Sequence, residues 1–440
     1  MISLAGPVAL GELGWMAMTV VDTIMVGALG AAAIGAAGIG SSLFYVFSIF
    51  GMGLLLGLDT LVAQAFGAGN RDDCHHSLGQ ALWLALALTP IIMGVVRLLP
   101  PLFPIWGVDP AVARGAIPFL LTLSWSTLPL LLYAALRRYL QGIGHVRPVM
   151  SVLITANVVN WFGNWLLITG HWGFPALGVT GSALSTCLAR LYMAALLAVS
   201  IWWIERRAHV HAGSILRWPE RRRITRLLRL GFPAASQIIL EIGAFAATGV
   251  LASKLGAVPL AAHQIALNCA AVSFMVPLGI ASAAAVAVGQ AIGRGNAAYA
   301  RRAGYIALTL GCTVVALAAI AFVVFPNSIL RIYTNDALVL EAGTALLAIA
   351  ATFQLFDGTQ TILTGALRGL GNTRAPMLAN LGGYYIFGLP LGWFLCFRLG
   401  MGINGLWAGL TLSLVLIAMA LLWEWRRESA PKAGYRQAVR

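Results

Sequence analysis

The sequence predicts an all-α polytopic membrane protein, and three observations support this fold class. The chain of 440 residues is 60% hydrophobic and only 10% charged, whereas ordinary soluble domains contain about 25% charged residues. Its mean hydropathy is +0.87. The apolar residues gather in long segments, each close to the roughly 20 residues that a helix needs to cross a bilayer, and the pattern of these segments occurs twice along the chain.

Twelve apolar segments follow one another, so we predict twelve transmembrane helices. They are placed at residues 2–28, 38–63, 78–99, 116–136, 148–169, 179–203, 229–252, 262–288, 303–325, 340–363, 376–398 and 403–424. Basic residues concentrate in the cytoplasmic connections of membrane proteins. With both termini on one side, that side collects most of the 28 basic residues, and the other side has only Arg97, Arg114, Lys254, Arg331 and Arg398. Both termini are therefore expected in the cytoplasm.

The two halves of the chain align as an internal repeat. Pro7 falls on Pro233, Gly30 falls on Gly256, and the motif VAQAFGAGN at 62–70 falls on VGQAIGRGN, always 226 residues later. Each copy has six spans, and an even number gives the copies the same orientation, related by an axis along the membrane normal. We therefore expect two six-helix lobes related by a pseudo-two-fold axis, with a cavity between them.

This repeat also predicts the domain boundaries. An N-terminal lobe at 1–204 and a C-terminal lobe at 229–425 are joined by a basic cytoplasmic connection at 205–228, and a basic cytoplasmic tail occupies 426–440.

Composition and motifs exclude several classes of protein. The net charge is +14, but the basic residues are dispersed in short connections where they set topology, so a nucleic-acid partner is rejected. The five cysteines have no CxxC or Cys/His spacing, which argues against a metal site or a disulfide framework. HExxH, GxSxG and a phosphate loop are absent, so an enzyme is not expected and uphill work must use an ion gradient.

Glu241 and Asp357 are the main candidate functional residues. Glu241 lies ten residues inside the apolar stretch at 230–252, and Asp357 is equally deep in another span. A charged side chain at the centre of a bilayer costs about 2.5–3.5 kcal/mol, so two such acids are best accommodated in one wet cavity. This favours an ion-coupling site. The alternatives are a protonated Glu241 that packs against a neighbouring helix, or one that reaches an interface.

Other polar residues of the spans extend the candidate sites. Positions four apart share a helix face, so Phe353 is expected beside Asp357, and Asn160 beside Asn164, with Asn157 three residues earlier. Asp22 is too deep in its span for a capping role and completes a polar cluster of the N-terminal lobe. The asparagines could equally form interhelical hydrogen bonds. Further candidates for lining the cavity are Gln264, Asn268 and Gln354.

Four stretches resemble the multidrug and toxic compound extrusion (MATE) transporters, particularly their NorM-like branch. They are VVDTIMVGALG from Val20, AQAFGAGN from Ala63, AAHQIALNCAAVSFMVPLGIASAAAVAVGQAIGRGN from Ala261 and FQLFDGTQTILTGALRGLGNTRAPM from Phe353. The resemblance covers nearly the whole chain. It implies a V-shaped pair of lobes that exports organic cations in exchange for sodium ions or protons. It also implies that Glu241 and Asp357 form the cation site of one lobe, and that Asp22, Asn160 and Asn164 form the polar cluster of the other.

Two positions depart from the family pattern. Phe353 stands where sodium-coupled relatives have a tyrosine, which leaves only a ring face for a cation. Asn164 stands where proton-coupled relatives tend to have an aspartate. The resemblance therefore leaves the choice between sodium and proton open.

The leading hypothesis is a secondary active multidrug antiporter of the bacterial inner membrane. Its partners would be small organic cations, sodium ions or protons, and membrane lipids. No cofactor is expected, and no metal other than a transported sodium ion at Glu241 and Asp357. A monomer is the simplest expectation, because the cavity lies between lobes of one chain. The alternatives are a flippase or exporter of an amphipathic or lipid-linked metabolite, and a ligand-binding membrane protein that does not transport.

Overall fold

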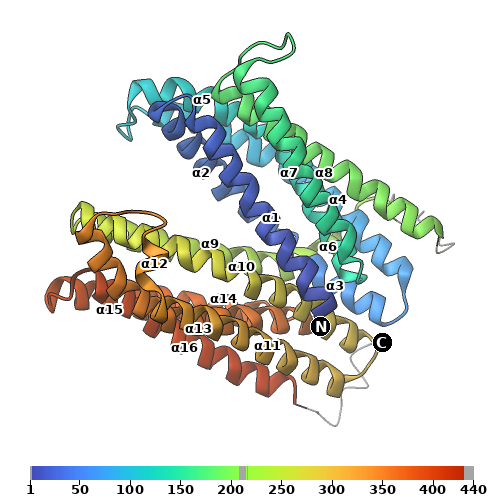
Figure 1. Cartoon of the computed structure of the whole chain (residues 1–440). Helices are drawn as coiled ribbons and strands as arrows, with labels where there is room; N and C mark the ends of the chain where they lie inside the picture. Colours follow the sequence, from blue (N-terminus) through green and yellow to red (C-terminus); the bar gives the residue numbers. More distant parts are fainter. Residues whose placement is uncertain (1, 208–214, 216, 431–440) are drawn as a thin grey trace. The chain divides into compact units, whose positions relative to one another are not determined.

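The computed structural model describes residues 2–207, 215 and 217–430, and its regular elements are all helical. Figure 1 shows them in chain order. The elements are α1 (Ile2–Gly27), α2 (Ala31–Leu54), α3 (Gly57–Gly67), α4 (Arg71–Arg97), η1 (Pro100–Leu102), α5 (Pro110–Ser124), α6 (Thr127–Gly142), α7 (Val146–Thr169), α8 (Val179–Arg207), α9 (Arg221–Ser253), α10 (Ala257–Gly293), α11 (Ala297–Val324), α12 (Pro326–Leu330), α13 (Ala337–Leu370), α14 (Arg374–Asn380), η3 (Leu381–Gly388), α15 (Leu389–Trp393), η4 (Phe394–Arg398) and α16 (Gly402–Glu428).

The predicted all-α membrane fold is confirmed. Among the described residues, ten helical stretches are long and apolar enough to cross a membrane, and α5 with α6 makes an eleventh span that bends by 48°. The remaining predicted span, 376–398, coincides with α14, η3, α15 and η4, which follow one another without a break. Its two π-helical stretches divide it into short pieces, so no single α-helix there has the length of a span.

The chain divides into two compact units. The N-terminal unit comprises Leu10–Phe66 and Asn70–Ala235, and the C-terminal unit comprises Met1–Ala9, Gly67–Gly69 and Ser236–Arg440. The main division falls between Ala235 and Ser236, and short segments at the start of α1 and at Gly67–Gly69 belong to the C-terminal unit. Leu4 and Ala5 at the start of α1 pack into the core of the C-terminal unit. Leu227 in the first turns of α9 packs into the core of the N-terminal unit. Each of these helix starts therefore belongs to the unit into whose core its apolar side chains pack.

The predicted basic connection contains the start of a helix. The prediction places it at 205–228, but α8 continues to Arg207 and α9 already begins at Arg221. Arginine has a high helix propensity, and Ile224, Leu227 and Leu228 have the three- and four-residue spacing of a buried helix face. Residues 208–214 and 216 of the connection, and 431–440 of the predicted tail, lie outside the described residues.

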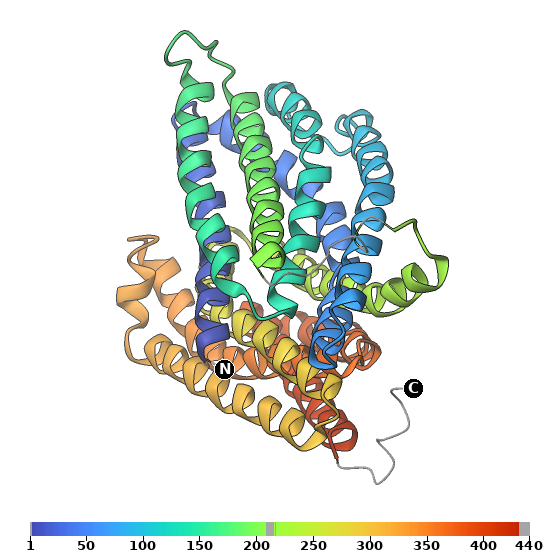
Figure 2. The same ribbon diagram turned by 90° about the vertical axis from the view of Figure 1, so that its right-hand side faces the viewer.

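Each unit has its own helix packing. In the N-terminal unit, α8 packs against α5, α6 and α7, and α2 packs against α5; Figure 2 shows the long helices of this unit running side by side. In the C-terminal unit, α13 is central and packs against α10, α11 and α16. The contact between α10 and α13 is close because small residues face each other, as Gly369 faces Ala285.

The repeated motifs form equivalent helix junctions. Gly69 and Gly295, one residue before the ends of the two matching motifs, have φ of +75° and +71°, a conformation that glycine adopts without steric cost. The next residues begin helices: the Asn70 side chain accepts a hydrogen bond from the backbone N–H of Asp73 (3.0 Å), and the Asn296 side chain accepts one from Tyr299 (2.9 Å). The motif is therefore a turn followed by an N-cap.

Candidate functional site

The two predicted acids lie together in the C-terminal unit. Glu241 on α9 faces Asp357 on α13, and Gln237 and Gln360 are close enough to hydrogen-bond Glu241. Asp357 is only 4% exposed and accepts a hydrogen bond from Nε2 of Gln360 over 3.3 Å. Gln237, Asp357 and Gln360 are buried and Glu241 is half-buried, so two carboxylates and two amides share one poorly solvated space. Carboxylate and amide oxygens are suitable ligands for a hard cation, and carboxylates can also carry protons.

Gln360 and Tyr384 belong to this cluster but were not predicted. Gln360 lies three residues after Asp357, so the helical period could have indicated it. Tyr384 on η3 is fully buried, its hydroxyl has no hydrogen-bond partner among the described residues, and it interacts electrostatically with both acids. No sequence pattern distinguishes it, because it stands in an apolar aromatic run, GGYYIFG.

Phe353, predicted to lie near the cation site, is enclosed by other aromatic rings. It is 1% exposed, and its ring centroid lies 5.3 Å from that of Trp407 and 6.0 Å from that of Phe245. Phe245 in turn lies 6.0 Å from Tyr384. An apolar aromatic wall therefore adjoins the acid pair, and the hydroxyl beside the acids belongs to Tyr384.

The three candidate cavity-lining residues have different positions. Gln354 is fully buried, and its Nε2 donates to Ser273 Oγ (2.5 Å) and to the carbonyl of Ala270 (3.3 Å), so it joins α13 to α10. Gln264 and Asn268 are exposed on α10, and the Asn268 side chain donates to the Gln264 carbonyl over 2.9 Å. Of the three, only Gln264 and Asn268 are exposed, and their role in lining a cavity stays a prediction.

The polar cluster of the N-terminal unit forms around Asp22 on α1. Its Oδ1 accepts from Nδ2 of Asn164 over 2.6 Å, and its Oδ2 accepts from the Thr186 hydroxyl over 3.2 Å. Asn164 also donates to Asn160 Oδ1 over 3.3 Å. Asn157 instead donates to the Gly14 carbonyl over 2.9 Å. The structure thus groups Asp22, Asn160 and Asn164 as predicted, and it places Asn157 in an interhelical hydrogen bond.

Asp22 opens onto a cavity of about 270 Å³ within the N-terminal unit. The cavity is lined by residues of α1, α2, α5 and α8, among them Tyr45, Ser182, Thr186 and Arg190. Thr186 and Arg190 were not predicted as site residues. The spacing of Ser182, Thr186 and Arg190 along α8 is four residues each, so one face of this helix carries all three.

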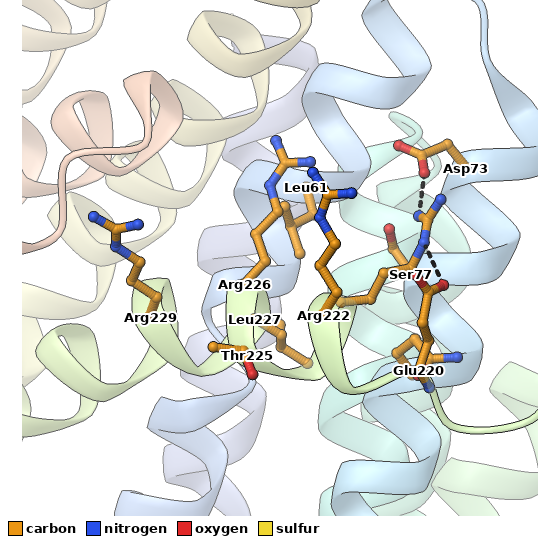
Figure 3. Close-up of a pocket in the computed structure, with 11 residues that line it drawn as sticks. Leu61, Asp73, Ser77, Glu220, Arg222, Thr225, Arg226, Leu227 and Arg229 are labelled. Atoms are coloured by element: carbon orange, nitrogen blue, oxygen red, sulfur yellow. Dashed lines mark hydrogen bonds and ion pairs between the residues drawn. The ribbon is translucent and has the colours of Figure 1, made fainter.

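A second cavity of the N-terminal unit, about 530 Å³ in volume, lies at the start of α9. Figure 3 shows Arg222, Arg226 and Arg229 around it, with Asp73 and Glu220 at one side. Arg223 forms ion pairs with both acids, at 3.2 Å to Glu220 Oε2. The predicted basic segment thus presents a cationic surface. Ion pairs with Asp73 and Glu220 hold one of its arginines, Arg223, in place.

Among the described residues, no group of three or more His, Cys, Asp or Glu side chains could hold a metal ion.

The polar residues inside the spans form hydrogen-bonded clusters around carboxylates, one in each unit. Ionisable side chains inside spans mark ion or substrate pathways in membrane proteins, so this fold with its two clusters has the features of a membrane transport protein. The MatE family model matches residues 7–166 and 233–394, and the chain belongs to the MatE family. The two matched segments begin at the equivalent prolines of the internal repeat.

The names of similar proteins agree with this membership. The chain is 35% identical to the probable multidrug resistance protein NorM of Mesorhizobium japonicum, over 97% of this chain and 93% of that protein. It is 37% identical to the probable multidrug resistance protein NorM of Burkholderia mallei, over 97% and 92%. An outward-facing multidrug resistance MATE family transporter has the same fold, with a TM-score of 0.88 at 18% identity, covering 97% of this chain and 95% of that one.

Proposed function

We propose that this protein is a secondary active multidrug exporter that releases organic cations in exchange for sodium ions or protons. The observation that carries the proposal is the pair of acids in the C-terminal unit, the half-buried Glu241 and the buried Asp357, which share Gln360. Relatives named multidrug resistance proteins, 35% and 37% identical over 97% of the chain, support the substrate class. The small-molecule substrates would be chemically diverse.

The acid pair supplies a means of coupling. Two neighbouring carboxylates in a poorly solvated site repel each other when both are charged, and a bound proton or cation relieves this repulsion. Occupancy can therefore favour one of two conformations of the protein. If a drug cation and the coupling ion compete for Glu241 and Asp357, the site holds one or the other, and transport of one requires release of the other.

The driving force depends on the number of coupling ions. Exchange of one monovalent cation for another moves no net charge, so the concentration gradient of the coupling ion would drive export alone. With two coupling ions, or with a neutral substrate, the membrane potential would add about 2.3 kcal/mol per charge per 100 mV.

The proposed location is the bacterial inner membrane, with both termini in the cytoplasm. The concentration of basic residues on the side of the termini supports this orientation. We also propose a monomer, because one chain supplies both units, each with its own polar cluster.

The test is export of a fluorescent organic cation from liposomes that contain the purified protein, with a sodium gradient and a pH gradient imposed separately. We expect flux under one of the two gradients, which identifies the coupling ion. Absence of flux under both gradients, and under both combined, would contradict the proposal.

Two variants test the assignment of the coupling site. Glu241→Gln and Asp357→Asn keep the size of each side chain but remove its charge, so each is expected to abolish gradient-driven efflux while leaving membrane insertion intact. Glu341→Gln is the control, because Glu341 lies on the exposed surface of the same helix as Asp357. Normal efflux in both acid variants would overturn the assignment.

A further inference from the structure

Three arginines near the start of α9 have no part in the proposed coupling mechanism. Arg222, Arg226 and Arg229 are exposed, and they line the cavity of about 530 Å³ in the N-terminal unit. Their spacing of four and three residues places them on one face of the helix. Figure 3 shows their side chains leaving α9 on the same side. Three positive charges are therefore gathered at one concave surface.

The two acids that line the cavity, Asp73 and Glu220, do not neutralise these three arginines. Both acids form ion pairs with Arg223. Within the described part of the chain, no ion pair joins any of the other three arginines to an acid. Four arginines and two acids line the cavity, which leaves it with a net charge of +2. The cavity is therefore suited to an anion.

The charges also conflict with the dipole of α9. The first turn of this helix contains Arg221, Arg222 and Arg223 and no acid. The N-terminus of a helix carries a partial positive charge, so cations are unfavourable there and anions are favourable. Membrane topology would explain basic residues anywhere in this connection, but it does not require them on one helix face around a cavity. A bound anion would relieve both the repulsion among the arginines and the conflict with the dipole.

The cavity lies where the chain enters the apolar part of a span. Arg229 is followed directly by the apolar run that begins at Leu230, and α9 is long enough to cross a membrane. Gln80, which lines the cavity, donates to the carbonyl of Trp218 over 3.2 Å. Trp218 stacks on Trp83, and both rings are exposed. Exposed tryptophans are typical of the interface between membrane and water, which favours a ligand from the membrane surface.

We propose that this cavity binds the phosphate of an anionic phospholipid, with Arg222, Arg226 and Arg229 as its partners. Guanidinium groups bind phosphate through paired, charge-assisted hydrogen bonds. Basic clusters beside a transmembrane helix attract anionic headgroups. The hydroxyls of Ser77 and Thr225 also line the cavity and can donate to phosphate oxygens. Because Ser77 belongs to α4, one headgroup would contact both α4 and α9.

Two lipids with the same tails and the same phosphodiester test the preference for an anionic headgroup. Phosphatidylglycerol is anionic, whereas phosphatidylcholine brings a positive choline toward the arginines. Each lipid carries the same fluorophore on one acyl chain, and its binding to the purified full-length protein in a neutral detergent is measured by fluorescence polarisation. The readout is the ratio of the two dissociation constants, which a loss of folded protein does not change. No transport is required, so the outcome is independent of the proposed function.

We expect the wild-type protein to prefer phosphatidylglycerol by about tenfold or more, and equal affinities would overturn the proposal. Replacing one cavity arginine by glutamine should lower the preference about fivefold, the contribution of one basic residue near a charged membrane surface. Replacing all three should remove most of it. An unchanged ratio in the folded triple variant would overturn the proposal.

The control removes the same number of charges from the same connection. It combines Arg206→Gln, Arg207→Gln and Arg221→Gln, because these arginines are exposed and do not line the cavity. We expect this variant to keep the wild-type ratio. An equal loss of preference in the control and in the cavity variant would show a general effect of charge and would overturn the site.

Thr225→Glu keeps the test decisive if the triple variant does not fold. It retains every arginine and places an acid one turn from Arg222 and one turn from Arg229, where it supplies an internal partner. An acid near the start of a helix is favourable, so the fold should be preserved. The preference for phosphatidylglycerol should fall about fivefold, and an unchanged ratio would contradict the proposal.

Soluble phosphates distinguish a lipid ligand from a free one. Sodium phosphate and glycerol 3-phosphate are added as competitors and compared with sodium chloride at the same ionic strength. Neither should displace labelled phosphatidylglycerol from the wild-type protein, because neither has acyl chains to hold it beside the span. Displacement at concentrations comparable with the dissociation constant of the lipid would assign the site to a soluble phosphate and overturn the lipid proposal.

Discussion

The hydroxyl of Tyr384 is one of two polar groups beside Glu241 and Asp357, with Gln360 Oε1, that have no hydrogen-bond partner among the described residues. A buried hydroxyl without a partner is unfavourable unless a ligand uses it. The family resemblance indicates that Phe353 lacks the hydroxyl found in sodium-coupled relatives, and Tyr384 supplies one from another element. We therefore expect Tyr384 to contribute to binding of the coupling ion.

Tyr384→Phe tests this expectation. Removing the hydroxyl should raise the ion concentration for half-maximal efflux up to about tenfold, the effect of one hydrogen bond to a charged group. Thermal stability should be unchanged, because the hydroxyl has no protein partner to lose. Tyr385→Phe is the control: its hydroxyl donates to the Leu240 carbonyl over 3.2 Å, so stability, not ion dependence, should respond. An unchanged ion dependence in Tyr384→Phe would contradict this role.

The residue-level predictions differ in how far they could be made from sequence. Glu241 and Asp357 were identifiable because a charge is rare in an apolar span. Gln360 was accessible from the helical period alone. Tyr384 was not assigned, because its role depends on which side chains surround it after packing. Gln354 is polar in sequence but proves to join two helices.

At the level of elements, the C-terminal unit is organised by the close packing of α10 against α13. The Cα of Gly365 lies against the backbone of Ala281, so a Cβ there would meet the backbone of α10. Small residues allow such approach between membrane helices. This explains the run of alanines in α10, IASAAAVAVGQ, which contributes little side-chain volume.

Gly365→Leu should destabilise the protein by about 1–3 kcal/mol or more, because the new side chain forces the two helices apart. The measurement is thermal unfolding of the purified protein in detergent, followed by tryptophan fluorescence. Gly382→Leu provides the control: it is in the same unit and a helical position, and its Cβ would meet no atom within 4 Å. Equal stability of the two variants would show that the close approach is not required.

The whole-molecule prediction concerns orientation. An even number of spans with cytoplasmic termini places the loop between α7 and α8 outside the cell and the segment before α9 inside. Phe174 and Trp218 are exposed positions in these two segments. In a background without the five native cysteines, a membrane-impermeant thiol reagent should label Phe174→Cys in intact cells. Trp218→Cys should react only after permeabilisation, and the reverse pattern would contradict the orientation.

The sequence by itself determined the membrane class, the approximate positions of most of the predicted spans and the repeat, because these depend on hydrophobic length and on residue identities that recur along the chain. It also located the acids, since burying a charge is costly wherever the helix packs. Tertiary structure decided the remainder. It assigned the start of α1 and of α9 to their units and placed Tyr384 beside the acids. These contacts join segments far apart in the chain, and helical periodicity contains no information about which faces meet.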